Sequence, residues 1–174
     1  MKKFYILLSI LIIIVTGCEY GSKTTKKGNN KYINSSLDSD GNVIIDTSDI
    51  TSEATFINYE VDGVTIQLIV VRATDGTIRV AFNTCQVCNP SPNAYFLQDG
   101  DYLVCQNCGN RFHIDEVGVK KGGCNPTPVE ELEEDGKIIK INKAYLESYK
   151  DKFENWNGPI LSLIHISEPT RQAE

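Results

Sequence analysis

Histidine and positive charge are both scarce in this sequence of 174 residues. It contains two histidines, and 17 Lys and Arg residues against 23 Asp and Glu residues give a formal net charge of −6. The acidic balance excludes a nucleic-acid-binding protein, because such proteins carry a basic surface. The sequence also has no catalytic triad, no phosphate-binding loop and no thioredoxin-like βαβ pattern around its cysteines.

A long hydrophobic run is missing as well. Lys2 and Lys3 precede the apolar segment Phe4–Val15, which is too short for a confident membrane span and predicts a signal peptide, residues 1–17. The closing letters VTGC resemble a bacterial lipobox, whose cysteine is diacylated and becomes the mature N-terminus. We therefore expect lipid on Cys18, which anchors the chain at the extracytoplasmic face of the cell membrane. An uncleaved anchor helix is the alternative, and it places the chain on the same side.

Two further segments lie outside the expected fold. Residues 18–50 begin with Glu19–Ser36, a polar stretch rich in Gly, Asn, Ser and Lys that predicts a flexible tether. The sequence LSLIHISEPTR, Leu161–Arg171, resembles the in-frame translation of a transposon-end sequencing adapter. We therefore expect residues 161–174 to be an artefact foreign to the protein. His113 then remains as the one native histidine.

The central part of the sequence combines β-rich runs with Asp-Gly pairs. Asp-Gly supplies the positive φ that tight hairpins require, and such pairs occur at residues 40–41, 62–63, 75–76, 99–100 and 135–136. The neighbouring runs are rich in Val, Ile, Thr and aromatic residues. We expect a mostly β domain with a small antiparallel sheet over residues 51–142, followed by a C-terminal helix over residues 143–160 that Asn142 caps. One face of this helix is apolar and should pack in the core: Tyr145, Leu146, Tyr149, Phe153 and Trp156.

Five cysteines follow Cys18, in the pattern C-x2-C-x16-C-x2-C-x15-C. They are Cys85, Cys88, Cys105, Cys108 and Cys124. Two residues between cysteines let a tight turn point both sulfurs at one ion while backbone amides donate to the thiolates. Two such knuckles make a tetrahedral four-sulfur site. In CQNCGNRF, we expect Gly109 to close the knuckle in a left-handed conformation and Phe112 to cover the site.

Several occupants suit four thiolates, and the spacing does not decide between them. Zinc gives a structural ribbon, one iron gives a rubredoxin-like centre, and two irons with two sulfides give a [2Fe-2S] cluster. Oxidation of each pair to a disulfide is a further alternative, although five cysteines leave one unpaired. His113 either tunes or ligates the centre, or makes an ordinary surface hydrogen bond.

Three segments, CQVCNP, CQNCGNRF and GGCNPTP, together resemble the FtrD-like membrane iron-sulfur protein family from Phe56 to Ile141. More distantly, the order of strand, cysteine pair and Gly/Pro loop is similar to that of a Rieske-type [2Fe-2S] domain. Cys88 and Cys108 stand at or near the places of its histidine ligands. The resemblance implies that both pairs, Cys85 with Cys88 and Cys105 with Cys108, are iron-sulfur ligands. Cys124 then replaces one ligand, carries a reactive thiol, or lies unligated in a covering loop.

The lipobox places the chain outside the cytoplasm on a lipid anchor, and the resemblance implies an iron-sulfur protein that transfers single electrons, with [2Fe-2S] as the favoured cluster. Such a protein is an electron carrier more than an enzyme, and it implies a membrane redox or permease partner, linked to iron transport. Cysteine in place of histidine adds negative charge, so the potential should move from the Rieske range of about −150 to +300 mV towards about −400 mV. A zinc-stapled extracytoplasmic binding module and a thiol-disulfide exchange protein are the alternatives.

Overall fold

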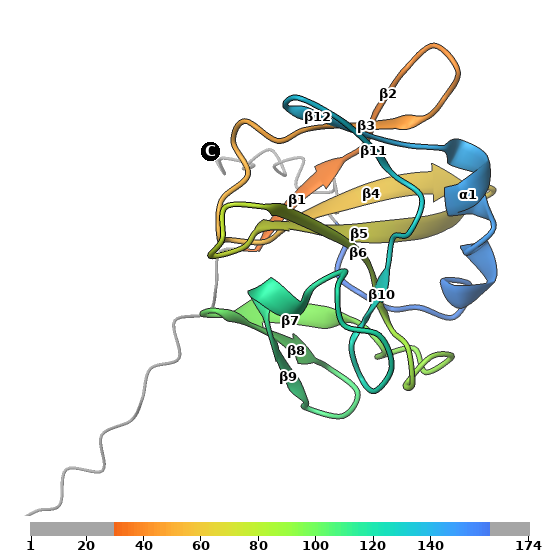
Figure 1. The fold of residues 1–174 in the computed structure, drawn as a ribbon. Helices are drawn as coiled ribbons and strands as arrows, with labels where there is room; N and C mark the ends of the chain where they lie inside the picture. The colour runs from red at the N-terminus through yellow and green to blue at the C-terminus, as the bar shows by residue number, and fades with distance from the viewer. Residues whose placement is uncertain (1–29, 161–174) are drawn as a thin grey trace, which may run out of the picture.

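The computed structural model describes residues 30–160, which form three β-sheets and one short α-helix (Figure 1). The first sheet has the order β1 (Lys31–Asn34), β4 (Thr55–Val61), β5 (Val64–Arg72), β6 (Ile78–Cys85), β10 (Pro126–Pro128). The second has the order β11 (Glu133–Asp135), β12 (Ile138–Ile141), β3 (Val43–Asp46), β2 (Ser36–Leu37). The third has the order β7 (Phe96–Asp99), β8 (Tyr102–Cys105), β9 (Arg111–His113). The prediction of a mostly β fold with small antiparallel sheets is confirmed, and only β1 pairs in parallel, with β4.

The Asp-Gly pairs lie at connections between paired antiparallel strands, as the sequence predicts. Asp62-Gly63 joins β4 to β5 in a two-residue connection, where Val61 pairs with Val64. The φ angles are 48° at Asp62 and 77° at Gly63. Positive φ at both central residues is the signature of a two-residue type I′ turn, whose twist matches that of the flanking strands. These turns set the register that carries β6 into Cys85 and β8 into Cys105.

The central strands β4, β5 and β6 separate two hydrophobic cores, with the second sheet on one side and the third sheet on the other (Figure 1). Along β5, Leu68 and Val70 enter the first core, while Ile69 and Val71 enter the second. This alternation is the two-residue period of a strand buried on both faces. The second core includes Cys85 and Cys105. The cysteines are therefore built into the packing between two sheets.

Residues 31–46 are largely strand, so the prediction of a tether is wrong for this part of the chain. β1 is an edge strand with mostly exposed side chains, which explains its polar composition. Its Tyr32 ring nevertheless stacks on Phe56 at a centroid distance of 5.1 Å, and Val43 of β3 is fully buried. The signal peptide, Cys18 and the segment 161–174 lie outside the described residues.

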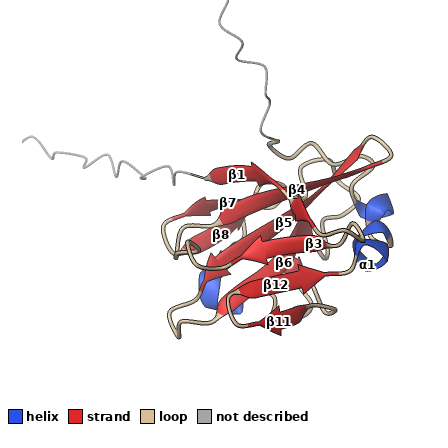
Figure 2. Ribbon diagram, turned by 90° about the horizontal axis from the view of Figure 1, so that it is seen from above, coloured by secondary structure: helices blue, strands red, loops and turns tan. Residues whose placement is uncertain are grey.

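The C-terminal helix begins where the sequence predicts but is much shorter. α1 (Lys143–Glu147) lies at one end of the layers (Figure 2), and Asn142 Oδ1 accepts a hydrogen bond from Ala144 N at 2.8 Å. Two short 3₁₀ helices complete the described elements, Ile114–Glu116 and Lys150–Lys152. The chain bends after α1 so that the Trp156 indole Nε1 can donate to Asn83 O at 2.8 Å. The apolar face still packs as expected, because Leu146 and Phe153 are buried in the first core.

Asn83 connects the third sheet to β6 of the first sheet. This fully buried residue of β6 accepts a hydrogen bond from Phe96 N through its Oδ1 at 2.7 Å. Its Nδ2 donates to Gln67 Oε1 at 2.7 Å and to Phe96 O at 3.3 Å. The Asn83 side chain thus takes the place of a strand partner for β7, at the point where the two cysteine-bearing strands approach each other.

We expect Asn83→Ala to lower the free energy of unfolding by about 2–4 kcal/mol, because it leaves buried groups of Phe96 and Gln67 without partners. Urea denaturation followed by circular dichroism measures the change. Asn93→Ala, at an exposed side chain of the following loop, is the control and should change stability by less than about 0.5 kcal/mol. Equal midpoints for the two variants would contradict the role given to Asn83.

Candidate metal centre

Three chain segments bring the five cysteines to one end of the second core. Cys85 is the last residue of β6 and Cys88 lies in the turn that follows; Cys105 and Cys108 repeat this arrangement at the end of β8. Cys124 lies in the loop that precedes β10. Cys85 and Cys105 are fully buried, whereas Cys108 is exposed and the other two are half-buried. The group therefore has a buried end and an exposed end.

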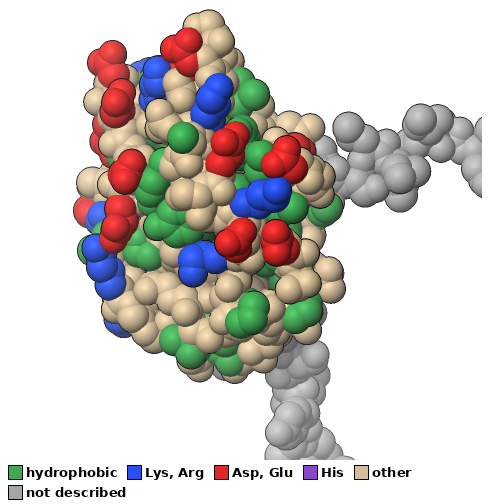
Figure 3. All heavy atoms as spheres, turned by 90° about the vertical axis from the view of Figure 1, so that its right-hand side faces the viewer, with side chains coloured by type: hydrophobic (Ala, Val, Ile, Leu, Met, Phe, Trp, Pro, Cys, Tyr) green, Lys and Arg blue, Asp and Glu red, His purple; other side chains and the backbone are tan. Residues whose placement is uncertain are grey.

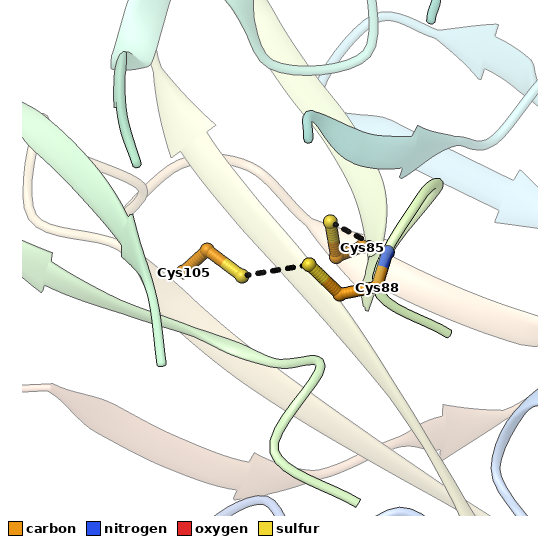
Figure 4. A group of neighbouring side chains, drawn as sticks. All are labelled: Cys85, Cys88 and Cys105. Carbon is orange, nitrogen blue, oxygen red and sulfur yellow. Dashed lines mark hydrogen bonds between the residues drawn. The ribbon is translucent and has the colours of Figure 1, made fainter. Parts of the chain in front are cut away.

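The sulfurs form two triads that share Cys88. In the inner triad, the Sγ atoms of Cys85, Cys88 and Cys105 lie within 4.8 Å of one another, and Figure 4 shows these side chains facing each other. In the outer triad, the same limit holds for Cys88, Cys108 and Cys124. The Cys88 and Cys105 Sγ atoms are 3.9 Å apart, which joins the two knuckles. All five are free thiols, so the described residues contain a single thiol group and no separate oxidised pairs.

Each knuckle directs backbone amides at its first cysteine. Cys88 N donates to Cys85 Sγ at 3.4 Å, and Asn89 N closes the turn on Cys85 O at 3.1 Å. In the second knuckle, Gly109 N donates to Cys105 O at 2.8 Å, and Gly109 has a φ of 74°. The predicted left-handed conformation of Gly109 is confirmed. The backbone amides of Val87 and Cys88 act on the Cys85 thiol, and those of Asn107 and Cys108 act on the Cys105 thiol, and both pairs lower the pKa of the sulfur that they face. Such donors spread the negative charge of a thiolate.

Phe112 is half-buried against the second core, where its ring meets Phe96 edge-on at a centroid distance of 6.0 Å. It stands opposite Leu103 in the pairing of β8 with β9. The side chain thus packs in the core that contains Cys85 and Cys105. Its role as a cover for a bound metal stays a prediction.

Burial and hydrogen bonding shift the pKa values of the thiols in opposite directions. Burial raises the pKa of Cys85 and raises the pKa of Cys105 to about 11, although backbone amides in each turn oppose the shift. For Cys88, burial is outweighed by hydrogen bonds from Asn107 and the neighbouring thiols, which lower its pKa. Buried thiols of this kind become thiolates at neutral pH when a cation replaces their protons. The donor set is made of sulfur, so it fits a thiophilic metal or an iron-sulfur cluster.

Gln86 fixes the loop that carries Cys124 to the first knuckle. Its backbone N donates to Asn125 O and its Nε2 donates to Pro126 O, both at 3.0 Å. Its Oε1 accepts from Gly122 N, also at 3.0 Å. Sequence reasoning did not single out Gln86, because the same position of the second knuckle also holds glutamine, and Gln106 Nε2 bonds within its own turn to Val104 O.

His113 lies at the end of the third sheet that is away from Cys105. Its Nδ1 accepts a hydrogen bond from Asp115 N at 3.3 Å, and its ring meets Tyr102 edge-on at 5.4 Å. In β8, Tyr102 is at the opposite end from Cys105. Among the described residues, the groups with metal-ligating geometry contain cysteine alone. The structure therefore favours the hydrogen-bonding alternative for His113.

The chain segments that carry the cysteines contain no charged residue. Residues 80–98, 102–110 and 122–129 contain no Asp, Glu, Lys or Arg, in a chain in which 23% of residues are charged. The lower part of Figure 3, at the end where Figure 1 places β7–β9, is dominated by hydrophobic and uncharged side chains. Val87 stands within the first knuckle with 62% of its surface exposed. The segments that carry the exposed end of the thiol group are thus uncharged and partly apolar.

Comparison with known proteins gives one family and one solved structure. The family model described as "Membrane iron-sulfur containing protein FtrD-like" matches residues 50–153, which confirms the resemblance seen in the cysteine segments. No curated protein matches the chain. The crystal structure of the quaternary ammonium Rieske monooxygenase CntA in complex with inhibitor MMV12 is 18% identical, with a TM-score of 0.34 over 50% of this chain and 26% of that chain. The chain thus corresponds to about a quarter of that protein's length. Between residues 30 and 160, no helix is long and apolar enough to cross a membrane.

Proposed function

We propose that this chain, which belongs to the FtrD-like membrane iron-sulfur protein family, carries single electrons on a cluster held by its cysteines. The observation that carries the proposal is the convergence of five free thiols on one end of a β core, two of them fully buried and one exposed. When bound, an iron-sulfur cluster supplies a centre that accepts and returns one electron.

A [2Fe-2S] cluster suits this arrangement better than a single ion. One zinc or one iron needs four sulfurs around a single point. The five thiols instead form an inner and an outer triad that share Cys88. We propose Cys85 and Cys105 as ligands at the buried end, where solvent is excluded, and Cys88 and Cys108 as ligands towards the surface.

The exposed end offers a route for the electron. Cys108 is exposed, and the three stretches around the cysteines are uncharged. A face without charge fits a partner whose own face is uncharged, because neither surface then has to desolvate an unpaired ion on contact. We propose a membrane redox protein or permease as this partner, with iron transport as the process it serves.

The position of Asn30, the first described residue, supports a location of the cysteine face near the membrane. Asn30 Oδ1 accepts a hydrogen bond from Gln98 N of β7 at 3.2 Å, so the chain enters the fold beside the cysteine-bearing sheet. We propose that lipid on Cys18 anchors the protein at the extracytoplasmic face of the membrane. About a dozen residues separate Cys18 from Asn30, and a fully extended chain of that length spans at most about 40 Å. The cysteine face would then stay within reach of a membrane partner.

Iron, zinc and acid-labile sulfide content, together with the visible spectrum of anaerobically purified protein, test the proposal. We expect iron and sulfide in equal amounts with visible absorption. Iron without sulfide would indicate a rubredoxin-like centre and contradict the cluster. Zinc without colour would contradict electron transfer altogether and leave a metal-stapled binding module.

A further inference from the structure

The exposed end of the cysteine group has one thiol more than the cluster requires. A [2Fe-2S] cluster takes four cysteines, and the chain brings five together. We propose that Cys108 and Cys124 alternate as the fourth ligand, so that Cys124 is a spare ligand at the end that solvent reaches. This inference rests on the proposed function, because it requires that the cluster be present.

The geometry places the surplus at the outer end. Cys108 and Cys124 both belong to the triad around Cys88, and neither belongs to the inner triad. At the inner end, Cys85 and Cys105 are fully buried, and the third member of their triad is Cys88 itself. Cys124 can therefore replace Cys108 as a ligand, but it cannot replace either of the two buried cysteines.

Exchange requires a small movement of the two thiols, and both lie in loops outside the strand pairing. Cys108 lies in an exposed turn next to Gly109, and Cys124 follows Gly122 and Gly123, which have φ angles of 79° and 67°. Gln86 keeps the second loop beside the first knuckle through its three hydrogen bonds. Gln86 is thus a positioning residue, which limits Cys124 to the outer end of the centre.

The exchange itself is balanced. The metal–sulfur bond to Cys108 breaks and a metal–sulfur bond to Cys124 forms. Cys124 releases its proton on binding and the freed Cys108 thiolate takes one up, so no electron is transferred and the net charge does not change. A protein with this device keeps four thiolate ligands when one exposed thiol is oxidised or alkylated.

Limited alkylation of the loaded, full-length protein with iodoacetamide, followed by peptide mass spectrometry, gives a direct test. We expect label on both Cys108 and Cys124 and none on Cys85, Cys88 or Cys105 while the visible absorption persists. Label confined to Cys124 would show that it is a bystander and overturn the proposal. Label confined to Cys108 would overturn it equally, because Cys124 would then be the permanent ligand.

Alanine variants give a second test with iron, sulfide and electron paramagnetic resonance as readouts. Cys108→Ala should keep the iron and sulfide content of the native protein, whereas Cys108→Ala/Cys124→Ala should lose both. Cys105→Ala is the matched control and should lose the cluster although Cys124 is present. Adding Gln86→Ala to Cys108→Ala should also lose it. A colourless Cys108→Ala protein would overturn the exchange while native protein with a cluster upholds the proposed function, and colourless native protein would remove the proposed function itself.

Discussion

Cys85→Ala is expected to abolish the bound iron and the visible absorption of the protein. Cys85 is fully buried, ends β6 and accepts the amide of Cys88. The other two thiols of its triad, Cys88 and Cys105, are proposed ligands themselves, so none is free to replace it. Its loss therefore leaves the inner end of the centre with one ligand too few.

The same substitution should lower the melting temperature by about 10 °C or more, because metal binding contributes directly to folding. Cys85 lies on the first sheet and Cys105 on the third sheet, so a bound cluster would hold the two sheets together. Val87→Ala, at an exposed side chain of the same knuckle, is the control and should leave both iron content and melting temperature near native values. Retention of iron in Cys85→Ala would contradict the ligand set.

The elements that the sequence predicted well depend on local signals. Asp62-Gly63 specifies its hairpin through two consecutive positive φ angles, and Asn142 specifies the start of α1 through bonds to residues two and three positions away. The strands that were missed depend on distant partners. β1 has few apolar residues and is fixed by its pairing with β4. The segment after α1 is likewise fixed by a distant contact, the hydrogen bond from Trp156 to Asn83.

The same division holds at the metal centre. Each Cys-x-x-Cys unit is a local turn, so its geometry follows from the spacing, and Gly109 adopts the left-handed conformation that the knuckle needs. The placement of Cys124 beside Cys88 depends on Gln86, which lies 36 residues from Gly122 along the chain. No local pattern identifies such a contact. The uncharged stretches can be read from the sequence, but only the fold shows that all three lie at one end of the domain.

The ligand at position 108 should set the reduction potential. With four thiolates, we expect a midpoint near about −400 mV, and replacing one anionic ligand by neutral imidazole should raise it by on the order of 100 mV or more. The reason is electrostatic: reduction adds a negative charge to the centre, and each thiolate removed makes that charge less costly. The stretches that carry the cysteines contain no Lys or Arg to offset the charge of the thiolates.

Cys108→His/Cys124→Ala and Cys124→Ala form the matched pair for this prediction. Both lack the spare thiol, so they differ only in the ligand at position 108, and a redox titration monitored by electron paramagnetic resonance compares their midpoints. The histidine variant should also show a midpoint that falls with rising pH, because a neutral imidazole ligand can lose a proton and become anionic, which a thiolate cannot do. The slope should be absent from Cys124→Ala. Identical midpoints and slopes would mean that residue 108 does not bind the centre, and the electron would then enter at another edge of the thiol group.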